Sequence, residues 1–334
     1  MSHTTLDLAI KKLLVGSLAL TAAALTACQD STSPVDPATD IRTARSGTGK
    51  PGATQTVLFA GYKDAQVNYD IYAMNPDGSN VRRLTTDTTK DVFPDFAPDN
   101  RKFVWVRSLD GIRSELFTAN YDGSKPTQLT RMGADVFEPR YSPDGTKIVF
   151  AAAVREQTDN GFTVNYDIYV INVDGSGLTR LTYEKADDRA PAWSPNGQTI
   201  AFHSDRSGFN AIYRMNAGGL DVHLMVDCGT AGCVDPAFSP EGRRLAYADR
   251  TDNVIRVIDL DGENLPMAVG PATERLNRRP TWTKDGGKVV FASNRGIEET
   301  KELYVGTPGQ TDIASVQRLT VFSPGEAEMP SYSH

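Results

Sequence analysis

The stretch Ala190-Pro191-Ala192-Trp193-Ser194-Pro195-Asn196-Gly197 is one of six related copies along this chain of 334 residues. The first prolines of successive copies are separated by 45, 52, 45, 44 and 50 residues. A repeat of this length that is built from short strands is typical of a β-propeller. The other copies begin at Phe93, Glu138, Asp235, Arg279 and Met329.

Each copy predicts one four-stranded blade, whose strands we call A to D from the central channel outward. Tight turns are expected at Asp144-Gly145 and Asp174-Gly175, because glycine accepts the positive φ that such turns need. Strand B is nearly continuously apolar, as at 57–59, which favours burial on both faces. In the copy that begins at Glu138, the strands A to D are expected at 139–142, 147–151, 167–172 and 178–182.

The two ends of the repeat array complement each other. Residues 56–60 match a strand B that has no strand A before it, and the copy at Met329 supplies a strand A with no strand B after it. We therefore predict an all-β fold over residues 54–334, a six-bladed β-propeller. Pairing of its C-terminal strand with the N-terminal blade would close the ring and remove exposed sheet edges.

The N-terminal 27 residues have the pattern of an export signal. Two lysines precede a short apolar run at 13–24, which is shorter than the roughly 20 residues of a membrane span. The run ends in Leu25-Thr26-Ala27-Cys28, which resembles the lipobox of bacterial lipoproteins and predicts a signal peptide at 1–27 with lipidation of Cys28. The alternative is an ordinary secretory signal with an incidental cysteine.

Residues 28–53 are rich in Ser, Thr, Pro, Gly and Asp and predict a flexible tether, because so few apolar side chains cannot offset the ordering entropy. We expect an exported protein, lipid-anchored on the periplasmic side of a bacterial envelope. Gln29 after the lipidated cysteine favours the outer membrane.

The two other cysteines, Cys228 and Cys233, close a short glycine-containing loop. Export places them in an oxidising compartment, which favours a disulfide. Zinc is the alternative and would need two further ligands, of which only His223 is near in sequence.

The segments 191–206 and 211–216 resemble the repeat of the TolB propeller, the WD40-like PD40 type, and so do 70–78 and 83–85. The resemblance covers about residues 54–334 and implies the propeller fold. TolB is a soluble periplasmic protein of the Tol–Pal system with an additional N-terminal domain, whereas a tether stands in that place here. The chain is therefore predicted to be a TolB-like lipoprotein.

Strand order divides the predicted disc into two faces. The A–B and C–D connections are uniformly tight, while the B–C and D–A connections vary and include an insertion at 154–165. We call the second set the variable face; variable loops on a rigid scaffold are where recognition usually sits. Charged residues near its channel mouth are candidates for binding a protein or peptide, and the alternative is a solvated rim whose charges pair with each other. These candidates are Asp91, Glu138, Asp188, Arg189, Asp235, Arg278, Arg279, Glu326 and Glu328.

Two further patterns bear on function. Ser204-Asp205-Arg206 recurs as Ser293-Asn294-Arg295, which favours a role in the repeat over a role in one site. The sequence contains no nucleophile elbow, zinc-protease motif or phosphate loop, and only four histidines, so no catalytic residue is predicted. A polysaccharide- or peptide-acting lyase or hydrolase at the channel mouth is the alternative; it would show His, Arg and carboxylates from several blades in one tight cluster.

The remaining predictions concern ligands and partners. The net charge of −7 argues against nucleic acid as a partner. No metal site or cofactor is predicted, although Ca²⁺ bound by carboxylates stays open. We expect a monomeric propeller that binds a protein or peptide of the cell envelope.

Overall fold

The computed structural model describes residues 55–62, 68–158, 161–262, 265–272, 275–295, 300–322 and 325–333. The predicted signal peptide, Cys28 and the tether lie outside the described residues. Within those residues, no helix is long and apolar enough to cross a membrane.

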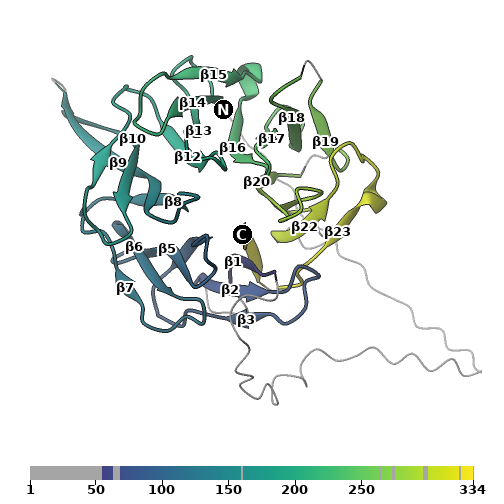
Figure 1. The fold of residues 1–334 in the computed structure, drawn as a ribbon, viewed down its shortest axis with the longest axis horizontal. Coiled ribbons are helices and arrows are strands. Elements are labelled where there is room, and N and C mark those ends of the chain that lie inside the picture. The colour runs from purple at the N-terminus through teal and green to yellow at the C-terminus, as the bar shows by residue number, and fades with distance from the viewer. Residues whose placement is uncertain are drawn as a thin grey trace, which may run out of the picture. The chain divides into compact units, whose positions relative to one another are not determined.

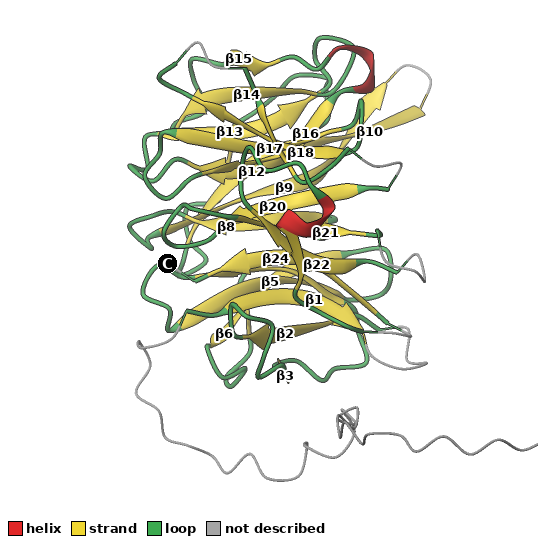
Figure 2. Cartoon of the chain, turned by 90° about the vertical axis from the view of Figure 1, so that its right-hand side faces the viewer, coloured by secondary structure: helices red, strands yellow, loops and turns green. Residues whose placement is uncertain are grey.

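Six four-stranded antiparallel sheets surround a central axis, as predicted (Figure 1). The strands of each sheet run from the axis outward, and Figure 2 shows the sheets edge-on. Blade 1 consists of β24 (Glu326–Tyr332), β1 (Val57–Tyr62), β2 (Asp70–Met74) and β3 (Arg82–Arg83). Blade 2 consists of β4 (Asp91–Phe96), β5 (Lys102–Ser108), β6 (Ser114–Asn120) and β7 (Thr127–Gln128). Blade 3 consists of β8 (Val136–Tyr141), β9 (Lys147–Thr158), β10 (Gly161–Asn172) and β11 (Thr179–Arg180).

The second half of the ring repeats this plan. Blade 4 consists of β12 (Asp188–Trp193), β13 (Thr199–Ser204), β14 (Ala211–Asn216) and β15 (His223–Val226). Blade 5 consists of β16 (Cys233–Phe238), β17 (Arg244–Asp249), β18 (Val254–Asp259) and β19 (Met267–Val269). Blade 6 consists of β20 (Asn277–Trp282), β21 (Val289–Ser293), β22 (Glu302–Gly306) and β23 (Val316–Arg318).

The predicted closure of the ring is confirmed. β24 pairs antiparallel with β1, with Val57 opposite Tyr332 and Tyr62 opposite Glu326. The Thr56 amide donates to the Ser333 hydroxyl at 2.9 Å, and the Ser333 amide donates to the Thr56 carbonyl at 2.9 Å. Blade 1 therefore has the same four strands as the other blades.

The core lies within and between the blades. Strand B is buried on both faces, as predicted; residues 57–60 of β1 have no exposed surface. The aromatic residue two positions after each first proline is buried in four blades, as at Phe96 and Trp282, and half-buried at Trp193 and Phe238. These positions serve packing between neighbouring sheets.

The repeated phrase encodes a β-bulge in every inner strand. The residue before its first proline has a positive φ in all six copies, between 48° and 60°. The pairing of strand A with strand B shifts register at this point, for example between Arg189 and Ala192. A bulge redirects a side chain, and this one turns four of the six residues into the channel cavity described below.

A second repeated contact fastens strand C to the segment after strand D. In blade 3, the Thr182 hydroxyl accepts the Ile168 amide at 2.9 Å and donates to the Asp167 carboxylate at 3.1 Å. Blades 1, 2 and 6 have the same arrangement, whereas strand C of blades 4 and 5 begins with Ala211 and Val254 and has no carboxylate to take part. The equivalent pairs are Asp70 with Thr85, Glu115 with Thr130, and Glu302 with Thr320.

The insertion at 154–165, expected as a loop, is largely an extension of two strands. β9 and β10 stay paired from Lys147 opposite Asn172 to Thr158 opposite Gly161. β-Branched residues such as Val154 and Val164 suit the pleated hairpin. The longer interval between the second and third copies therefore builds a longer hairpin on the variable face.

Candidate functional site

Two of the predicted binding residues, Asp91 and Asp188, are fully buried and hold their own blades together. The Arg107 guanidinium donates two hydrogen bonds to Asp91, each 2.7 Å long. The Arg206 guanidinium donates two hydrogen bonds to Asp188, each 3.0 Å long. Both carboxylates begin strand A. The Asp91 pair joins strand A to strand B of blade 2, and the Asp188 pair joins strand A to the B–C connection of blade 4.

The recurring Ser-x-Arg pattern serves the repeat, as expected from its recurrence. Arg206 also donates to the Ser204 hydroxyl at 3.0 Å. In blade 6, Arg295 donates to Ser293 at 3.0 Å and to the Asn277 amide oxygen at 2.9 Å. Asn277 occupies the position that Asp188 has in blade 4.

The bulge residues Glu138, Ala190, Asp235 and Arg279 line a cavity in the channel. The Arg279 guanidinium reaches across the ring from blade 6 to Glu138 in blade 3, at 3.3 Å, and lies 4.4 Å from the centre of the Phe93 ring. The cavity has a volume of about 20 Å³, which is the room of one water molecule or little more. The ion pair therefore bridges the channel at this level.

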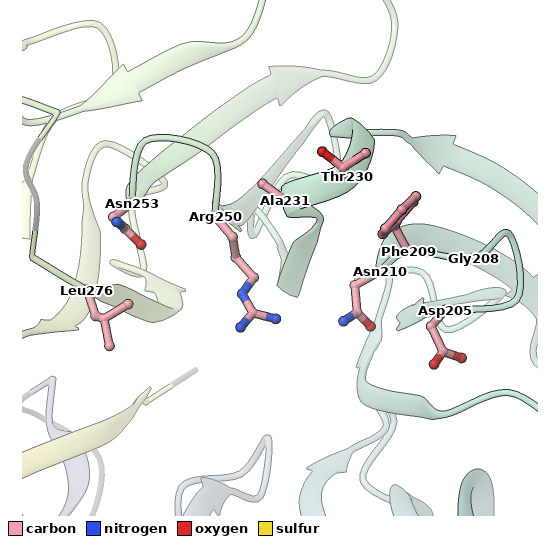
Figure 3. A pocket seen from close by; sticks show the side chains of 9 residues that line it. All are labelled: Asp205, Gly208, Phe209, Asn210, Thr230, Ala231, Arg250, Asn253 and Leu276. Carbon is pink, nitrogen blue, oxygen red and sulfur yellow. The ribbon is translucent and has the colours of Figure 1, made fainter.

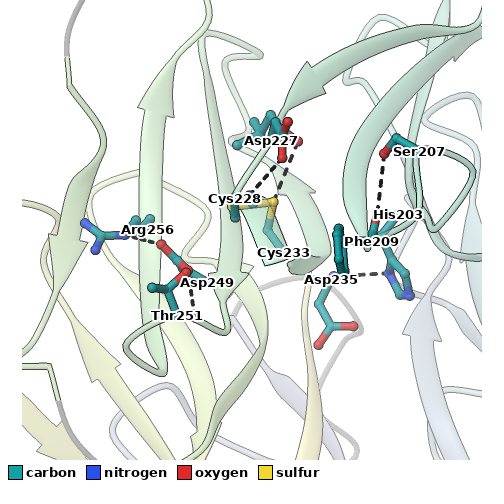
Figure 4. Close-up of a disulfide and its surroundings, with 12 residues drawn as sticks. His203, Ser207, Phe209, Asp227, Cys228, Cys233, Asp235, Asp249, Thr251 and Arg256 are labelled. Carbon is teal, nitrogen blue, oxygen red and sulfur yellow. Dashed lines mark hydrogen bonds and ion pairs between the residues drawn. A yellow bond between two sulfur atoms is a disulfide. The ribbon is translucent and has the colours of Figure 1, made fainter. Parts of the chain in front are cut away.

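His203 is buried behind this cavity. Its Nδ1 accepts the Asp235 amide at 3.4 Å (Figure 4). Burial lowers the pKa of His203, and the nearby carboxylates of Asp235 and Glu138 act in the opposite direction. His203, Arg279 and these carboxylates form the kind of cluster that the enzyme alternative requires, but the cavity beside them is too small for a sugar or a peptide.

The other predicted residues have varied surroundings. The Arg189 guanidinium lies 3.4 Å from the centre of the Tyr166 ring, a cation–π contact. Glu326 and Glu328 share the Lys301 ammonium at 3.4 and 3.2 Å. Arg278 is half-buried at the beginning of β20. The structure thus brings Glu138, Asp235 and Arg279 together, while the other predicted residues lie apart from this cluster.

A larger hollow on the variable face is lined by the connections of blades 4 and 5 and by the segment before blade 6 (Figure 3). Its volume is about 440 Å³, within the range of small-molecule sites. We call it the rim pocket. None of the nine predicted residues lines it. Its lining residues are Asp205, Gly208, Phe209, Asn210, Thr230, Ala231, Arg250, Asn253 and Leu276.

One wall of the rim pocket is held by backbone hydrogen bonds between blades 4 and 5. The Cys233 amide donates to the Asn210 carbonyl at 2.8 Å, and the Arg250 amide donates to the Gly232 carbonyl at 3.0 Å. Gly232 has a φ of +80°, and a Cβ there would lie 2.9 Å from the Asn210 carbonyl oxygen. This close approach requires glycine.

A disulfide joins Cys228 and Cys233, whose Cα atoms are 5.6 Å apart (Figure 4). It closes the loop that contains the 3-10 turn Gly229–Ala231, and Thr230 and Ala231 of this turn line the rim pocket. The sulfur atoms are bonded to each other, so they are not zinc ligands in this structure. Within the described residues, no three His, Cys, Asp or Glu side chains are grouped as a metal site.

Sequence reasoning missed the rim pocket because its residues come from four separate connections. One signal was present, namely the absence of an acidic residue at Ala211 and Val254, where strand C begins in blades 4 and 5. In the other four blades, the acidic residue at this position accepts a hydrogen bond from the threonine after strand D. Its absence marks the two blades in which the repeat departs from its pattern.

The six blades and their shared inner bulge define a β-propeller protein. The family described as the TolB beta-propeller domain, PD40, matches residues 157–333, more than half of the chain. The chain therefore belongs to this family.

Among curated proteins, the chain is 35% identical over 147 residues to a protein TolB homolog of Chlorobium luteolum, covering 43% of this chain and 33% of that protein. It is 26% identical over 143 residues to an uncharacterized protein of Agrobacterium fabrum, Atu1656, covering 40% of this chain and 48% of that protein. The matched regions thus span less than half of each relative.

Two solved structures share the fold. TolB from Acinetobacter baumannii has a TM-score of 0.68 at 21% identity, over 83% of this chain and 66% of that one. Kuenenia stuttgartiensis hydrazine synthase has a TM-score of 0.65 at 14% identity, over 84% of this chain and 47% of that one. Identities this low show a common architecture alone.

Proposed function

We propose that this chain is a non-catalytic, exported propeller that binds a protein or peptide of the bacterial envelope on its variable face. Lipidation of Cys28 would anchor it to the membrane, on the periplasmic side. Kinship with a TolB homolog supports an envelope setting, and the predicted signal at 1–27 supports export.

The rim pocket carries this proposal, because it is a concave site of about 440 Å³ on the variable face. Exposed aromatic side chains on the same face support it. Within the described residues, the aromatic side chains among the large exposed apolar ones are Phe162, Tyr183 and Phe209. Phe162 lies near the tip of the β9–β10 hairpin, Tyr183 in the D–A connection after blade 3 and Phe209 in the B–C connection of blade 4. Aromatic residues are enriched in protein interfaces.

The ion pair across the channel supports the non-catalytic part of the proposal. The clustered His203, Glu138, Asp235 and Arg279 adjoin a cavity of only about 20 Å³, and Arg279 is engaged with Glu138. A partner would therefore dock on the rim and not thread through the ring.

Photocrosslinking in intact envelopes tests this proposal. The full-length protein would carry p-benzoylphenylalanine at Tyr183 on the variable face or, in a matched variant, at Leu220 on the tight-turn face. Both side chains are 68% exposed. We expect discrete adducts with envelope proteins from position 183 and none from position 220.

Cys28→Ser should release the protein from the membrane fraction and remove the adducts if the partner is membrane-bound. Equal adducts from both faces, or none from either, would contradict binding at the variable face.

A further inference from the structure

We propose that the rim pocket binds the C-terminal end of a peptide, with the terminal carboxylate on the Arg250 guanidinium and the last side chain against Phe209. The inference rests on the proposed function, since it assigns a ligand class to the same face.

Arg250 differs from the other arginines that end a strand B or follow it. Arg107, Arg206 and Arg295 are each bound by the residue that begins strand A of their own blade. In blade 5 that position is Cys233, which is in the disulfide. Within the described residues, the Arg250 guanidinium has no hydrogen bond or ion pair, and Figure 3 shows it pointing into the rim pocket.

The rim pocket is built in advance and does not depend on a ligand for its shape. Blades 4 and 5 lack the hydrogen bond, present in the other four blades, between a threonine after strand D and an acidic residue at the beginning of strand C. The disulfide closes the segment 228–233. The hydrogen bonds from Cys233 to Asn210 and from Arg250 to Gly232 hold this segment against blade 4 and against the end of β17. Departures from a repeated pattern concentrate at functional sites, and rigid walls lower the entropic cost of binding.

The polar lining matches a peptide terminus. A guanidinium pairs with a carboxylate through two parallel hydrogen bonds. The side-chain amides of Asn210 and Asn253 have no partner among the described residues, and each can both donate to and accept from a peptide group. Asp205 accepts the Asp187 amide at 2.9 Å; its negative charge, on the opposite side of the rim pocket from Asn253 in Figure 3, disfavours a carboxylate there and so orients the ligand.

The apolar lining explains why a terminal residue fits better than a free anion. Phe209 is 51% exposed and Leu276 is 41% exposed, and both line the same hollow as Arg250. A C-terminal residue carries its carboxylate and its side chain on one Cα atom. It can therefore reach a cationic and an apolar wall together, which inorganic anions cannot.

Fluorescence anisotropy with the full-length protein in detergent tests the assignment. The probe is fluorescein-Gly-Ser-Ala-Leu with a free carboxylate, and its C-terminal amide is the comparison. We expect the acid to bind at least about 10-fold more tightly, because hydrogen bonds to a charged group are stronger than those to a neutral amide. Raising the salt concentration should reduce this preference.

Arg250→Gln should abolish the preference for the acid. Arg243→Gln is the matched control, because Arg243 is an exposed arginine at the opposite end of the same strand, β17, on the tight-turn face; it should keep the preference. Equal binding of acid and amide, no binding of the acid, or an unchanged preference in Arg250→Gln would overturn the proposal.

Two further probes define the ligand class. An amide-capped peptide with an internal aspartate, or glucuronate, that binds as tightly as the acid probe would overturn the assignment to a peptide terminus. If no peptide probe binds but position 183 still gives crosslinked adducts, this inference is wrong and the proposed function is unaffected. If position 183 gives no adducts, the proposed function is contradicted.

Discussion

At the scale of the residue, one side-chain type has two roles on the same rim. Arg206 is neutralised by the buried Asp188 and stabilises its blade, whereas Arg250 projects into the rim pocket without a partner among the described residues. The partner at the beginning of strand A decides the role. An arginine held by a buried carboxylate is part of the scaffold, and only an unpaired one has its hydrogen-bonding capacity left for a ligand.

His203 predicts a pH dependence of folding. Burial lowers the pKa of His203, so below the unfolded pKa of about 6.5 the native state binds fewer protons than the unfolded chain. The contribution of neutral His203 to stability is therefore fully present above that pH and is lost as the pH falls. We expect His203→Gln to reduce the decrease in the free energy of unfolding between pH 7 and pH 5, measured by urea denaturation.

His223→Gln is the control for this measurement, because His223 is exposed in β15. It should retain the pH dependence of the wild type. An unchanged slope in His203→Gln would show that His203 takes up protons equally in the folded and unfolded chain.

At the scale of the element, the bulge in strand A places a strained residue directly before the first proline of every copy. Six non-glycine residues have positive φ at this position, a conformation that costs an L-residue about 1–2 kcal/mol. The strain persists because the bulge brings the inner strands together around the channel, where Glu138 and Arg279 meet.

Substitution at Ala190, with a φ of 48°, tests this strain. Ala190→Gly should stabilise the protein by about 0.5–1 kcal/mol, because glycine adopts this conformation freely. Ala190→Val should destabilise it by about 1–3 kcal/mol, because a β-branched residue resists a positive φ. Urea denaturation measures both.

The control is Ala192→Gly, two residues further along β12 and without a positive φ. There glycine should destabilise by about 0.5–1 kcal/mol. A loss of stability in Ala190→Gly equal to that in Ala192→Gly would contradict the strained conformation.

At the scale of the whole molecule, stability depends on joining the two ends of the propeller. β24 supplies the inner strand of blade 1 and also packs against β4 and β21 of the neighbouring blades. Without it, β1 presents an unpaired edge of fully buried apolar residues.

Deletion of residues 328–334 should make unfolding less cooperative, lower the urea m-value and promote association through the exposed edge of β1. Urea denaturation and light scattering measure these effects. A deletion of 45–53, in the predicted tether, should leave both measurements unchanged. A truncated protein that unfolds in one sharp transition at the wild-type urea concentration would contradict this role of β24.

The sequence by itself determined the number of blades, the order of their strands and the closure by the copy at Met329. Each of these features is local, since a proline phrase or an Asp-Gly turn signals its strand wherever it occurs. The spacing of Cys228 and Cys233 likewise favoured the disulfide that the structure contains.

Only the tertiary structure decided which charges remain available. Asp91 and Asp188 were expected at a binding mouth and lie in buried ion pairs, while the unpredicted Arg250 points into a pocket formed with Phe209 and Leu276. These residues are 26 to 67 positions apart and line one pocket only because blades 4, 5 and 6 are neighbours. Pairing and concavity depend on distances between blades, which no local pattern of residues records.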